Sequence, residues 1–315
     1  MTKLDFMKDG IPEDFGAPTG LPAESDQARR WQQQNQLWWE RHPMKYDETE
    51  ATRLVAEPGS AAFFHEVDER FFIRAEQIIG WSRRPFDTLI DFDALKEKRV
   101  LEVGVGCGSH ASLLSSAAGS FTGIDLTEYA TRMTSRRFQM EGRRSAISRM
   151  DAEQLAFPDA SFDFVWSWGV IHHSANTRRV LEEIHRVLRP GGICTCMVYH
   201  WSPWNAWIRG GLYYGILRGG FLRTRSLHRL LQETTDGALA RYYTVDEWRE
   251  LASERFTVES VRVYGHKEQL LPLPFGRAKE RLARLIPDRV GRWITNRPSI
   301  GFMLVSTLRK SPWPA

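Results

Sequence analysis

The sequence has no apolar stretch long enough to span a membrane and no recognisable leader. A spanning helix needs roughly 18 or more apolar residues in succession. The most apolar stretch, residues 204–222, is interrupted by Arg209, Arg218 and five glycines. Residues 1–20 are acidic and polar, without the basic start and apolar centre of a signal peptide. These absences predict a cytoplasmic protein without a transmembrane segment.

Cysteine and net charge are also scarce. The 315 residues include three cysteines, Cys107, Cys194 and Cys196, and their number and spacing favour neither a disulfide framework nor a zinc site. We therefore expect no metal, and we interpret the three as loop-filling or core residues. Lys and Arg number 43 against 39 for Asp and Glu, and this net charge of +4 does not indicate a nucleic-acid partner.

The first 95 residues are predicted to form a helical N-terminal extension. One helix is expected over residues 24–41, before Pro43, and a second begins after Ser60, whose hydroxyl can cap its first turn. Apolar residues recur along the second helix at spacings of three and four, as one buried stripe requires: Phe64, Val67, Phe71, Ala75 and Ile78.

From residue 96 the pattern alternates between strands and helices. Strands are expected over residues 99–103, 120–126, 145–150, 162–168 and 192–199, with helices over residues 109–118, 127–141 and 176–188 between them. The last of these helices is expected to stop at a turn over residues 189–192. Such alternation predicts an α/β fold with a parallel, doubly wound sheet whose core lies over residues 96–200.

After residue 200 the alternation stops. Residues 201–243 are rich in Trp, Tyr, Gly and Arg, and we expect a helical insertion there that lines an acceptor site. Residues 244–315 return to the core with a helix over 245–252 and strands over 257–263 and 300–308. A basic helical segment is expected over residues 275–294. With the five earlier strands, the prediction is a seven-stranded sheet.

A glycine-rich loop follows the first strand. Gly104, Gly106 and Gly108 stand at every second position where the strand ends and a helix begins. Glycine lets the backbone turn sharply and approach a ligand, and the helix N-terminus offers free N–H groups. The dinucleotide fingerprint would need its third glycine at position 109, which is Ser109, so the spacing disfavours NAD.

Two acidic residues end the next two strands. Asp125 lies 21 residues after Gly104, where a carboxylate can accept hydrogen bonds from both ribose hydroxyls. Asp151, after the third strand, can accept from an adenine amino group. Each also has a structural interpretation, Asp125 as a partner for the Thr127 helix start and Asp151 as a loop cap. Both lie at the carboxyl ends of adjacent strands, where open α/β sheets bind ligands.

Five blocks in order along residues 99–199 resemble the motifs of class I S-adenosylmethionine-dependent methyltransferases of the small-molecule type. The blocks are Glu102-x-Gly104-x-Gly106-x-Gly108, Gly123-Ile124-Asp125-Leu126, Asp151-Ala152-Glu153 with Ser161-Phe162-Asp163, Gly169-Val170-Ile171-His172-His173, and Leu188-Arg189-Pro190-Gly191-Gly192. The resemblance implies a Rossmann-like fold, S-adenosyl-L-methionine as the cofactor, and an N-terminal helical lid over it.

The resemblance also implies roles for single residues. The glycine loop would pack against the methionine part and ribose of the cofactor, Asp125 would bind the ribose, and Asp151 with the Ala152 backbone would bind the adenine. The candidate cofactor-binding residues are Glu102, Gly104, Gly106, Cys107, Gly108, Asp125, Leu126, Asp151, Ala152 and Trp168. The candidate lid contacts are Trp39, Tyr46 and Phe63.

An acceptor site is expected where the fourth and fifth strands end. His172 and His173 follow the fourth strand, and Tyr199, His200 and Trp201 lie at the end of the fifth. The methyl group of a sulfonium is already activated, so a base is needed only for a hydroxyl or ammonium acceptor. His172, His173 and Tyr199 are candidates for that base, although the histidine pair has a structural interpretation in holding its loop. His200 and Trp201 are candidate contacts for a small-molecule acceptor.

Other functions and partners stay open at this point. The same cofactor motifs would serve aminocarboxypropyl transfer or cyclisation, and a non-catalytic scaffold is a third alternative. Ser167-Trp168-Gly169-Val170 stands where many base and amide methyltransferases carry an Asn/Asp-Pro-Pro-aromatic motif, which counts against nucleic-acid or protein substrates. The tryptophan-rich segments are candidates for an oligomer interface, and the arginines of residues 209–229 for an anionic substrate or peripheral membrane contact.

Overall fold

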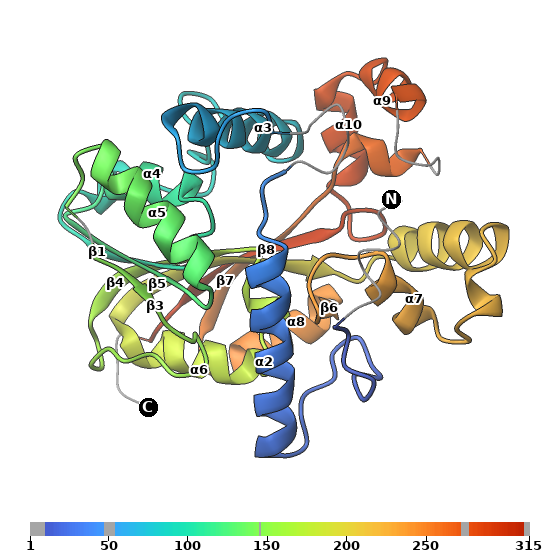
Figure 1. The fold of residues 1–315 in the computed structure, drawn as a ribbon, viewed down its shortest axis with the longest axis horizontal. Coiled ribbons are helices and arrows are strands. Elements are labelled where there is room, and N and C mark those ends of the chain that lie inside the picture. The colour runs from blue at the N-terminus through green and yellow to red at the C-terminus, as the bar shows by residue number, and fades with distance from the viewer. Residues whose placement is uncertain (1–9, 47–53, 145, 272–276, 312–315) are drawn as a thin grey trace.

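The computed structural model describes residues 10–46, 54–144, 146–271 and 277–311 (Figure 1). A central sheet has the strand order β3-β2-β1-β4-β5-β8-β7, and a two-residue strand, β6, pairs with β5 off this path. The strands are β1 (Arg99–Val103), β2 (Ser120–Asp125), β3 (Ala146–Arg149), β4 (Phe162–Trp168), β5 (Leu188–His200), β6 (Tyr242–Tyr243), β7 (Thr257–Tyr264) and β8 (Met303–Arg309). The first five are parallel, and β8 is antiparallel to both of its neighbours. The predicted α/β fold with a doubly wound, seven-stranded sheet is confirmed.

Helices cover both faces of the sheet. In Figure 1, α3 (Ala61–Ile78), α4 (Ser109–Ser115) and α5 (Glu128–Met140) lie on one face, and α6 (Thr177–Val187) and α8 (Val245–Ser253) lie on the other. Successive residues of a strand point to opposite faces. Accordingly, Val100 is buried in the cluster below α3, α4 and α5, while Leu101 is buried with side chains of α6 and α8. The order β2-β1-β4 reverses direction beside β1, and such a reversal opens a crevice at the strand ends.

The turn predicted before the fifth strand was wrong. Strand β5 begins at Leu188 directly after α6, so residues 189–192 belong to the strand rather than to a turn. The register of β5 against its partner β4 shifts there, with Phe162 opposite Leu188 but Phe164 opposite Ile193. The extra residues around Pro190 are accommodated as a bulge, which a motif-based prediction of a helix stop does not anticipate.

The predicted basic helix over residues 275–294 is two helices, α9 (Arg277–Arg284) and α10 (Asp288–Thr295). Pro287 separates them because it has no N–H to continue the first helix, and it immediately precedes α10. The last strand begins at Met303, three residues later than expected. Positions 275 and 276 of the predicted helix and position 145 of the predicted third strand lie outside the described residues.

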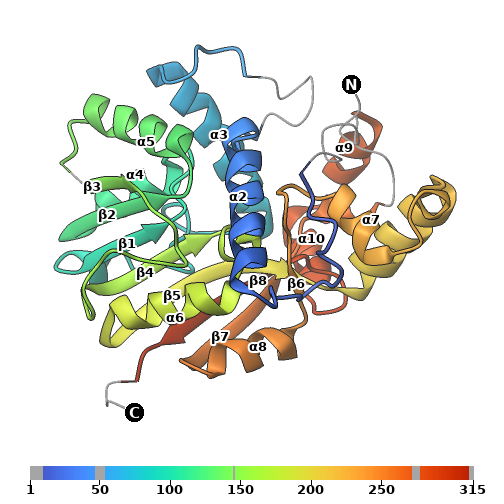
Figure 2. The ribbon, with the colours of Figure 1, turned by 60° about the horizontal axis from the view of Figure 1, so that its bottom comes forward.

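The N-terminal helices are attached in different ways. As predicted, Ser60 caps α3 by accepting a hydrogen bond from the Phe63 N–H at 3.1 Å, and the apolar stripe of α3 is buried. By contrast, α2 (Ser25–Arg41) buries only Trp31 and Asn35. It crosses the ends of the parallel strands (Figures 1 and 2), so polar contacts must supply much of its attachment.

Buried Arg241 holds the segment before α2. Its Nε donates to the Gly20 carbonyl at 2.8 Å, and its two terminal nitrogens donate to the Ser174 and Ala175 carbonyls. The guanidinium also lies 5.2 Å from the centre of the Phe15 ring. Three nitrogens of one planar group thus join the N-terminal segment, the loop after β4 and the start of β6.

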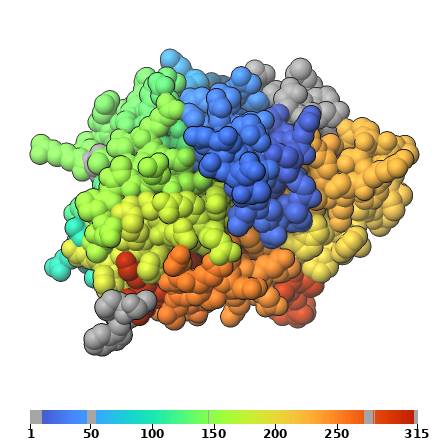
Figure 3. Space-filling model, turned by 90° about the horizontal axis from the view of Figure 1, so that it is seen from below, coloured from blue at the N-terminus to red at the C-terminus, as the bar shows by residue number. Residues whose placement is uncertain are grey.

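The insertion after β5 forms one end of the molecule. It contains η4 (Trp204–Leu217), η5 (Gly220–Leu222) and α7 (Leu227–Glu233) and returns to the sheet through β6. Figure 3 shows the N-terminal residues, in blue, between the green core and the yellow-to-orange insertion. The remaining elements are three short 3-10 helices: η2 (Asp93–Leu95), η3 (Ile171–His173) and η6 (Lys267–Leu270). Within the described ranges, no helix combines the length and apolarity needed to cross a bilayer.

Candidate active site

A cavity of about 450 Å³ runs from the glycine loop after β1 to the insertion after β5. Its first part is lined by residues 103–107, by 124–127 at the end of β2, and by Met150, Ala152 and Trp168. Its second part is lined by side chains of η4, α7, η6 and α9, and α2 and α3 close it from above. The cavity therefore joins the crevice at the strand ends to the insertion.

The two glycines at the start of the loop serve different purposes. Gly104 has a positive φ of 86°, and a side chain there would place its Cβ 2.2 Å from Val170 Cγ2. Gly106 also has a positive φ, 53°, but a Cβ there would meet nothing within 4 Å. Gly104 thus permits close packing inside the protein, whereas Gly106 leaves open space on the cavity wall.

Of the other candidates in and beside the loop, one lines the cavity and two lie away from it. Cys107 lines the cavity, and burial raises the pKa of its thiol to about 12, so it is an uncharged filler. Gly108 caps α4 and lies off the cavity wall as the described residues define it. Glu102 lies behind the loop and is fully buried, and its Oε2 has no hydrogen-bond partner within the described residues. Burial and the nearby Asp125 raise the pKa of Glu102 well above its usual range.

Asp125 both holds the loop and faces the cavity. Its Oδ1 accepts from the Thr127 N–H at 2.9 Å and the Thr127 hydroxyl at 2.8 Å, and its Oδ2 accepts from the Gly106 N–H at 3.2 Å. Burial raises the pKa of this carboxyl, and these hydrogen bonds oppose the rise. A carboxylate has about four acceptor positions, so a ligand hydroxyl can still be bound. Both interpretations of Asp125 therefore fit the same geometry.

Asp151 is engaged within the protein instead. Its Oδ1 accepts from the Glu153 N–H at 2.9 Å and from Gln32 Nε2 of α2 at 2.8 Å. Its neighbours Met150 and Ala152 line the cavity, but Asp151 does not belong to the lining that the described residues form. The expected adenine contact is thus not shown, because the side chain turns back to cap its own loop and hold the lid.

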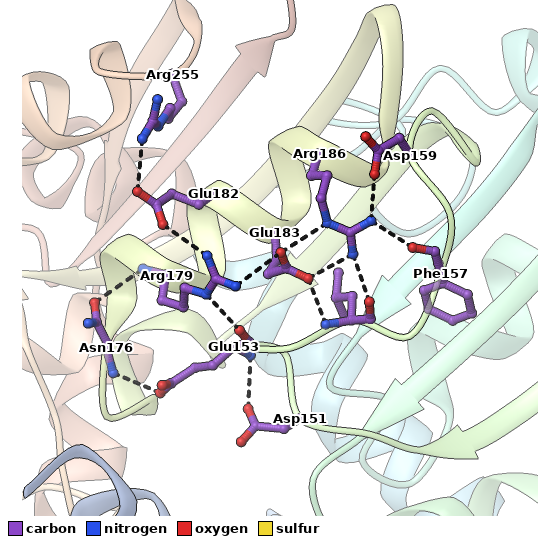
Figure 4. A network of polar contacts seen from close by, with 11 residues as sticks. Asp151, Glu153, Phe157, Asp159, Asn176, Arg179, Glu182, Glu183, Arg186 and Arg255 are labelled. Atoms are coloured by element: carbon purple, nitrogen blue, oxygen red, sulfur yellow. Dashed lines mark hydrogen bonds and ion pairs between the residues drawn. The ribbon is translucent and has the colours of Figure 1, made fainter. Parts of the chain in front are cut away.

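Figure 4 shows how α6 fixes this loop. Glu183 Oε2 accepts from the Leu155 N–H at 2.8 Å, and Arg179 Nε donates to the Glu153 carbonyl at 3.2 Å. Arg186 bonds to Glu183 and to the carbonyls of Leu155 and Phe157. These bonds attach the segment from Glu153 to Phe157, which directly follows the cavity-lining residues Met150 and Ala152, to α6.

Of the three candidate bases, His173 and Tyr199 line the cavity. His173 Nδ1 lies 2.5 Å from the Leu239 carbonyl, which can only accept, so in the neutral ring Nδ1 carries the proton and Nε2 has the free lone pair. Burial lowers the pKa of His173, and Asp236 opposes this. The Tyr199 hydroxyl donates to Asp236 Oδ1 at 3.3 Å.

His172, the third candidate base, does not reach the cavity. Its ring is fully buried, lies 3.9 Å from the Tyr199 ring, and is not part of the wall formed by the described residues. Two consecutive residues of η3 point in different directions, and only His173 reaches the cavity. His172 instead supports the ring of Tyr199, in line with the structural interpretation of the pair.

Four of the five lid and acceptor candidates line the cavity. Trp39, Tyr46, His200 and Trp201 line the cavity, and the Trp39 ring meets that of His173 edge-on at 5.0 Å. Phe63 does not belong to the cavity lining that the described residues form: it is fully buried in a cluster with Phe64, Val67, Cys107 and Met133. The apolar stripe of α3 is also buried, but Val67, Phe71, Ala75 and Ile78 of that stripe line the cavity.

Several residues at the site carried no signal in the sequence. Glu40 of α2 accepts from the Glu128 and Tyr129 N–H groups at 2.8 and 2.9 Å, and so caps α5 from 88 positions away. Asp236 comes from the insertion. Arg74 and Lys279 line the acceptor end from two separate elements, with Glu268 beside them and with Arg209, which was already a candidate contact for an anionic substrate. None lies in a motif, and only tertiary packing brings them together.

Comparison with known proteins finds matches to the part of the chain that carries the motifs. Residues 101–196 match the family model of a methyltransferase domain. The phthiotriol/phenolphthiotriol dimycocerosates methyltransferase of Mycobacterium tuberculosis is 41% identical over 97 residues, 30% of this chain and 35% of that protein. The 27-O-demethylrifamycin SV methyltransferase of Amycolatopsis mediterranei is 36% identical over 97 residues, 30% of this chain and 36% of that protein. The match thus spans about a third of the length of these relatives.

A solved structure extends the likeness of the fold. The complex between the Haloferax volcanii Trm112 methyltransferase activator and a methyltransferase aligns with 79% of this chain and 94% of the solved chain. The sequence identity is 18% and the TM-score is 0.52. At this sequence identity, the likeness shows a shared fold.

Proposed function

Residues 101–196 form a methyltransferase domain of the class I S-adenosylmethionine-dependent family, and on that premise we propose that the protein methylates a hydroxyl group of a small organic acceptor. The observation that carries the proposal is His173, whose ring lies on the cavity wall with Nδ1 fixed by the Leu239 carbonyl. Its Nε2 lone pair can accept the hydroxyl proton as a general base.

S-adenosyl-L-methionine is the proposed cofactor, and the glycine-loop end of the cavity has the features to hold it. Open space lies in front of Gly106, and the Asp125 carboxylate stands beside it with acceptor positions for ribose hydroxyls. Leu126, Ala152 and Trp168 complete the walls there. When bound, the cofactor supplies an activated sulfonium methyl group, so the protein's task is alignment of the acceptor and removal of one proton.

The lid would exclude water from the methyl group. Three side chains of α2 span from the lid to the core: Glu40 reaches the start of α5, Gln32 reaches Asp151, and Trp39 contacts His173. Because Trp39 touches the proposed base itself, closure of the lid and orientation of the base are coupled.

The acceptor would occupy the end of the cavity formed by the insertion. Trp201, Trp204, Tyr213 and Tyr214 provide flat apolar surface, and Arg74, Arg209 and Lys279 provide positive charge. Such a mixture of aromatic walls and a few polar groups is typical of small-molecule sites. The Amycolatopsis relative, whose name identifies it as acting on 27-O-demethylrifamycin SV, supports an oxygen acceptor.

The test is transfer of labelled methyl groups to a panel of phenols and aliphatic alcohols, each paired with its deoxy analogue. We expect label in hydroxyl compounds and none in their deoxy partners. Transfer only to amines or thiols would overturn the oxygen acceptor but leave the methyltransferase. Consumption of the cofactor with label in its aminocarboxypropyl part would overturn methyl transfer itself.

A further inference from the structure

Exposed apolar side chains are concentrated at one end of the molecule. Of the 14 large apolar side chains that are exposed among the described residues, nine lie in two segments. They are Trp207, Leu212, Ile216, Leu217 and Leu222 in the first, and Leu282, Leu285, Val290 and Trp293 in the second. Exposure reaches 93% for Leu222 and 69% for Trp293. Water-facing surface does not favour such residues, so a cluster of them indicates a partner.

The same two segments hold the positive charge of the chain. Residues 204–229 contain five arginines and no Asp or Glu, and residues 277–297 contain seven Lys or Arg and two acids. The whole chain has a net charge of only +4, so the remainder is negative. We call residues 204–229 and 277–297 the basic end.

The two segments lie at the same end of the fold. In Figures 1 and 2 the insertion and helices α9 and α10 lie at one end of the molecule, and α4 and α5 lie at the other end. Their inner sides meet at the cavity, which Arg209 and Tyr213 line from η4 and Lys279 lines from α9. The outer sides carry the exposed residues, with the Arg297 guanidinium 4.4 Å above the Trp293 ring.

The combination distinguishes between kinds of partner. A nucleic acid would be met by cations and would gain little from exposed Leu and Ile, whereas a protein interface is normally depleted in charge at its centre. Arginines interleaved with Leu, Ile and Trp are the composition of surfaces that rest in the headgroup region of a bilayer, with apolar tips below and cations at the lipid phosphates.

We propose that the basic end docks the protein on an anionic lipid surface. The helices lie on the bilayer and do not cross it. The outer faces of η4, α9 and α10 contact the lipid, while η4 and α9 also line the cavity from within. This arrangement places the acceptor end of the cavity next to the membrane. The docking does not depend on the chemistry of the active site and can be tested without turnover.

The experiment is flotation of the full-length protein with vesicles of phosphatidylcholine alone or mixed with phosphatidylglycerol. We expect binding to the mixed vesicles that weakens as salt is added, and little binding to phosphatidylcholine. Two variants should reduce binding by roughly tenfold or more, since each surface arginine or buried apolar tip adds to the affinity. One is Arg218→Gln with Arg225→Gln, and the other is Leu217→Ser with Trp293→Ser; all four side chains are exposed.

Matched controls lie at the opposite end of the molecule, around α5 (Figure 1). Arg132→Gln with Arg144→Gln removes the same charge near α5, and Met140→Ser removes an exposed apolar side chain there. Both should bind vesicles like the unchanged protein, and all variants should keep their melting temperature. Equal losses in controls and test variants, or equal binding to neutral vesicles, would overturn the proposal.

Two further outcomes would assign the basic end to another partner. Tighter binding to duplex DNA than to mixed vesicles at the same salt would indicate nucleic acid. A dimer in solution that Leu217→Ser with Trp293→Ser dissociates, together with no vesicle binding, would indicate a second copy of the chain.

Discussion

The two ends of the cavity are built in different ways. At the cofactor end the walls are the glycine loop and the ends of β1, β2 and β4, all within one stretch of about 70 residues, and much of the contact surface is backbone. At the acceptor end, side chains from α3, η4, η6 and α9 converge over more than 200 residues of sequence. Backbone geometry determines the first end, and tertiary packing of side chains determines the second.

His173 lies at the junction of the two ends, so its removal should have the largest effect. We expect His173→Ala to lower kcat by about 10²–10⁴-fold, the usual contribution of a general base, while cofactor affinity changes little. Rates with an identified acceptor and calorimetry with S-adenosylhomocysteine measure the two effects. The control is His172→Ala, which removes the adjacent, buried ring; an equal loss in both variants would mean that the pair is structural.

The two loop glycines separate folding from binding at the cofactor end. Gly104→Ala should destabilise the protein by roughly 2–5 kcal/mol, because it combines a positive φ with a clash against Val170. Gly106→Ala meets open space and should cost roughly 1 kcal/mol, yet place a methyl group in the cavity and weaken S-adenosylhomocysteine binding. Thermal melts and calorimetry test both. A stable Gly106→Ala variant with normal affinity would show that the ligand does not approach this loop.

The lid should respond more modestly to loss of one anchor. Glu40→Ala removes the acceptor for two N–H groups at the start of α5, a contact of the helix-cap kind worth about 1 kcal/mol. We expect S-adenosylhomocysteine affinity to fall several-fold and α2 to be cleaved faster in limited proteolysis. Glu40→Gln keeps an acceptor oxygen, so its affinity and its rate of cleavage should lie between those of the unchanged protein and of Glu40→Ala. Unchanged proteolysis in both variants would mean that α2 does not act as a lid.

The smallest expected effect is a shift of the pH profile. Burial lowers the pKa of His173 below 6.5, so the ring is neutral near pH 7, and activity should fall only as pH drops through that lowered pKa. The Asp236 carboxylate favours the protonated ring and holds this pKa up. Asp236→Asn should therefore move the acidic limb of kcat to lower pH. A limb that moves to higher pH, or does not move, would mean that another group titrates.

The strands and helices around the glycine loop were predicted well because their determinants are local. The unit of β1, glycine loop and α4, and the end of β2 at Asp125, follow from neighbouring residues. The sequence did not predict side-chain direction: Phe63 and His172 are buried away from the cavity, and Asp151 accepts a hydrogen bond from its own loop. A periodic pattern places a residue on an element but does not determine what its side chain meets.

The acceptor end was predicted only as a location. Asp236, Arg74 and Lys279 come from elements far apart in the sequence, and each has the ordinary appearance of a surface charge there. The same holds for Glu40, which caps a helix 88 residues away. Interactions of this kind depend on the finished fold, so a single sequence gives no periodicity or spacing from which to read them.

The central claim is that the glycine-loop end holds S-adenosylmethionine through Gly106 and Asp125. Calorimetry of S-adenosylhomocysteine with the unchanged protein and with Asp125→Ala tests it most directly, with NAD as the control ligand. We predict binding of S-adenosylhomocysteine, none of NAD, and a loss in the variant of roughly 1.5–3 kcal/mol, since hydrogen bonds to a charged acceptor are lost. Equal affinity of the variant, or binding of NAD in place of S-adenosylhomocysteine, would contradict the account.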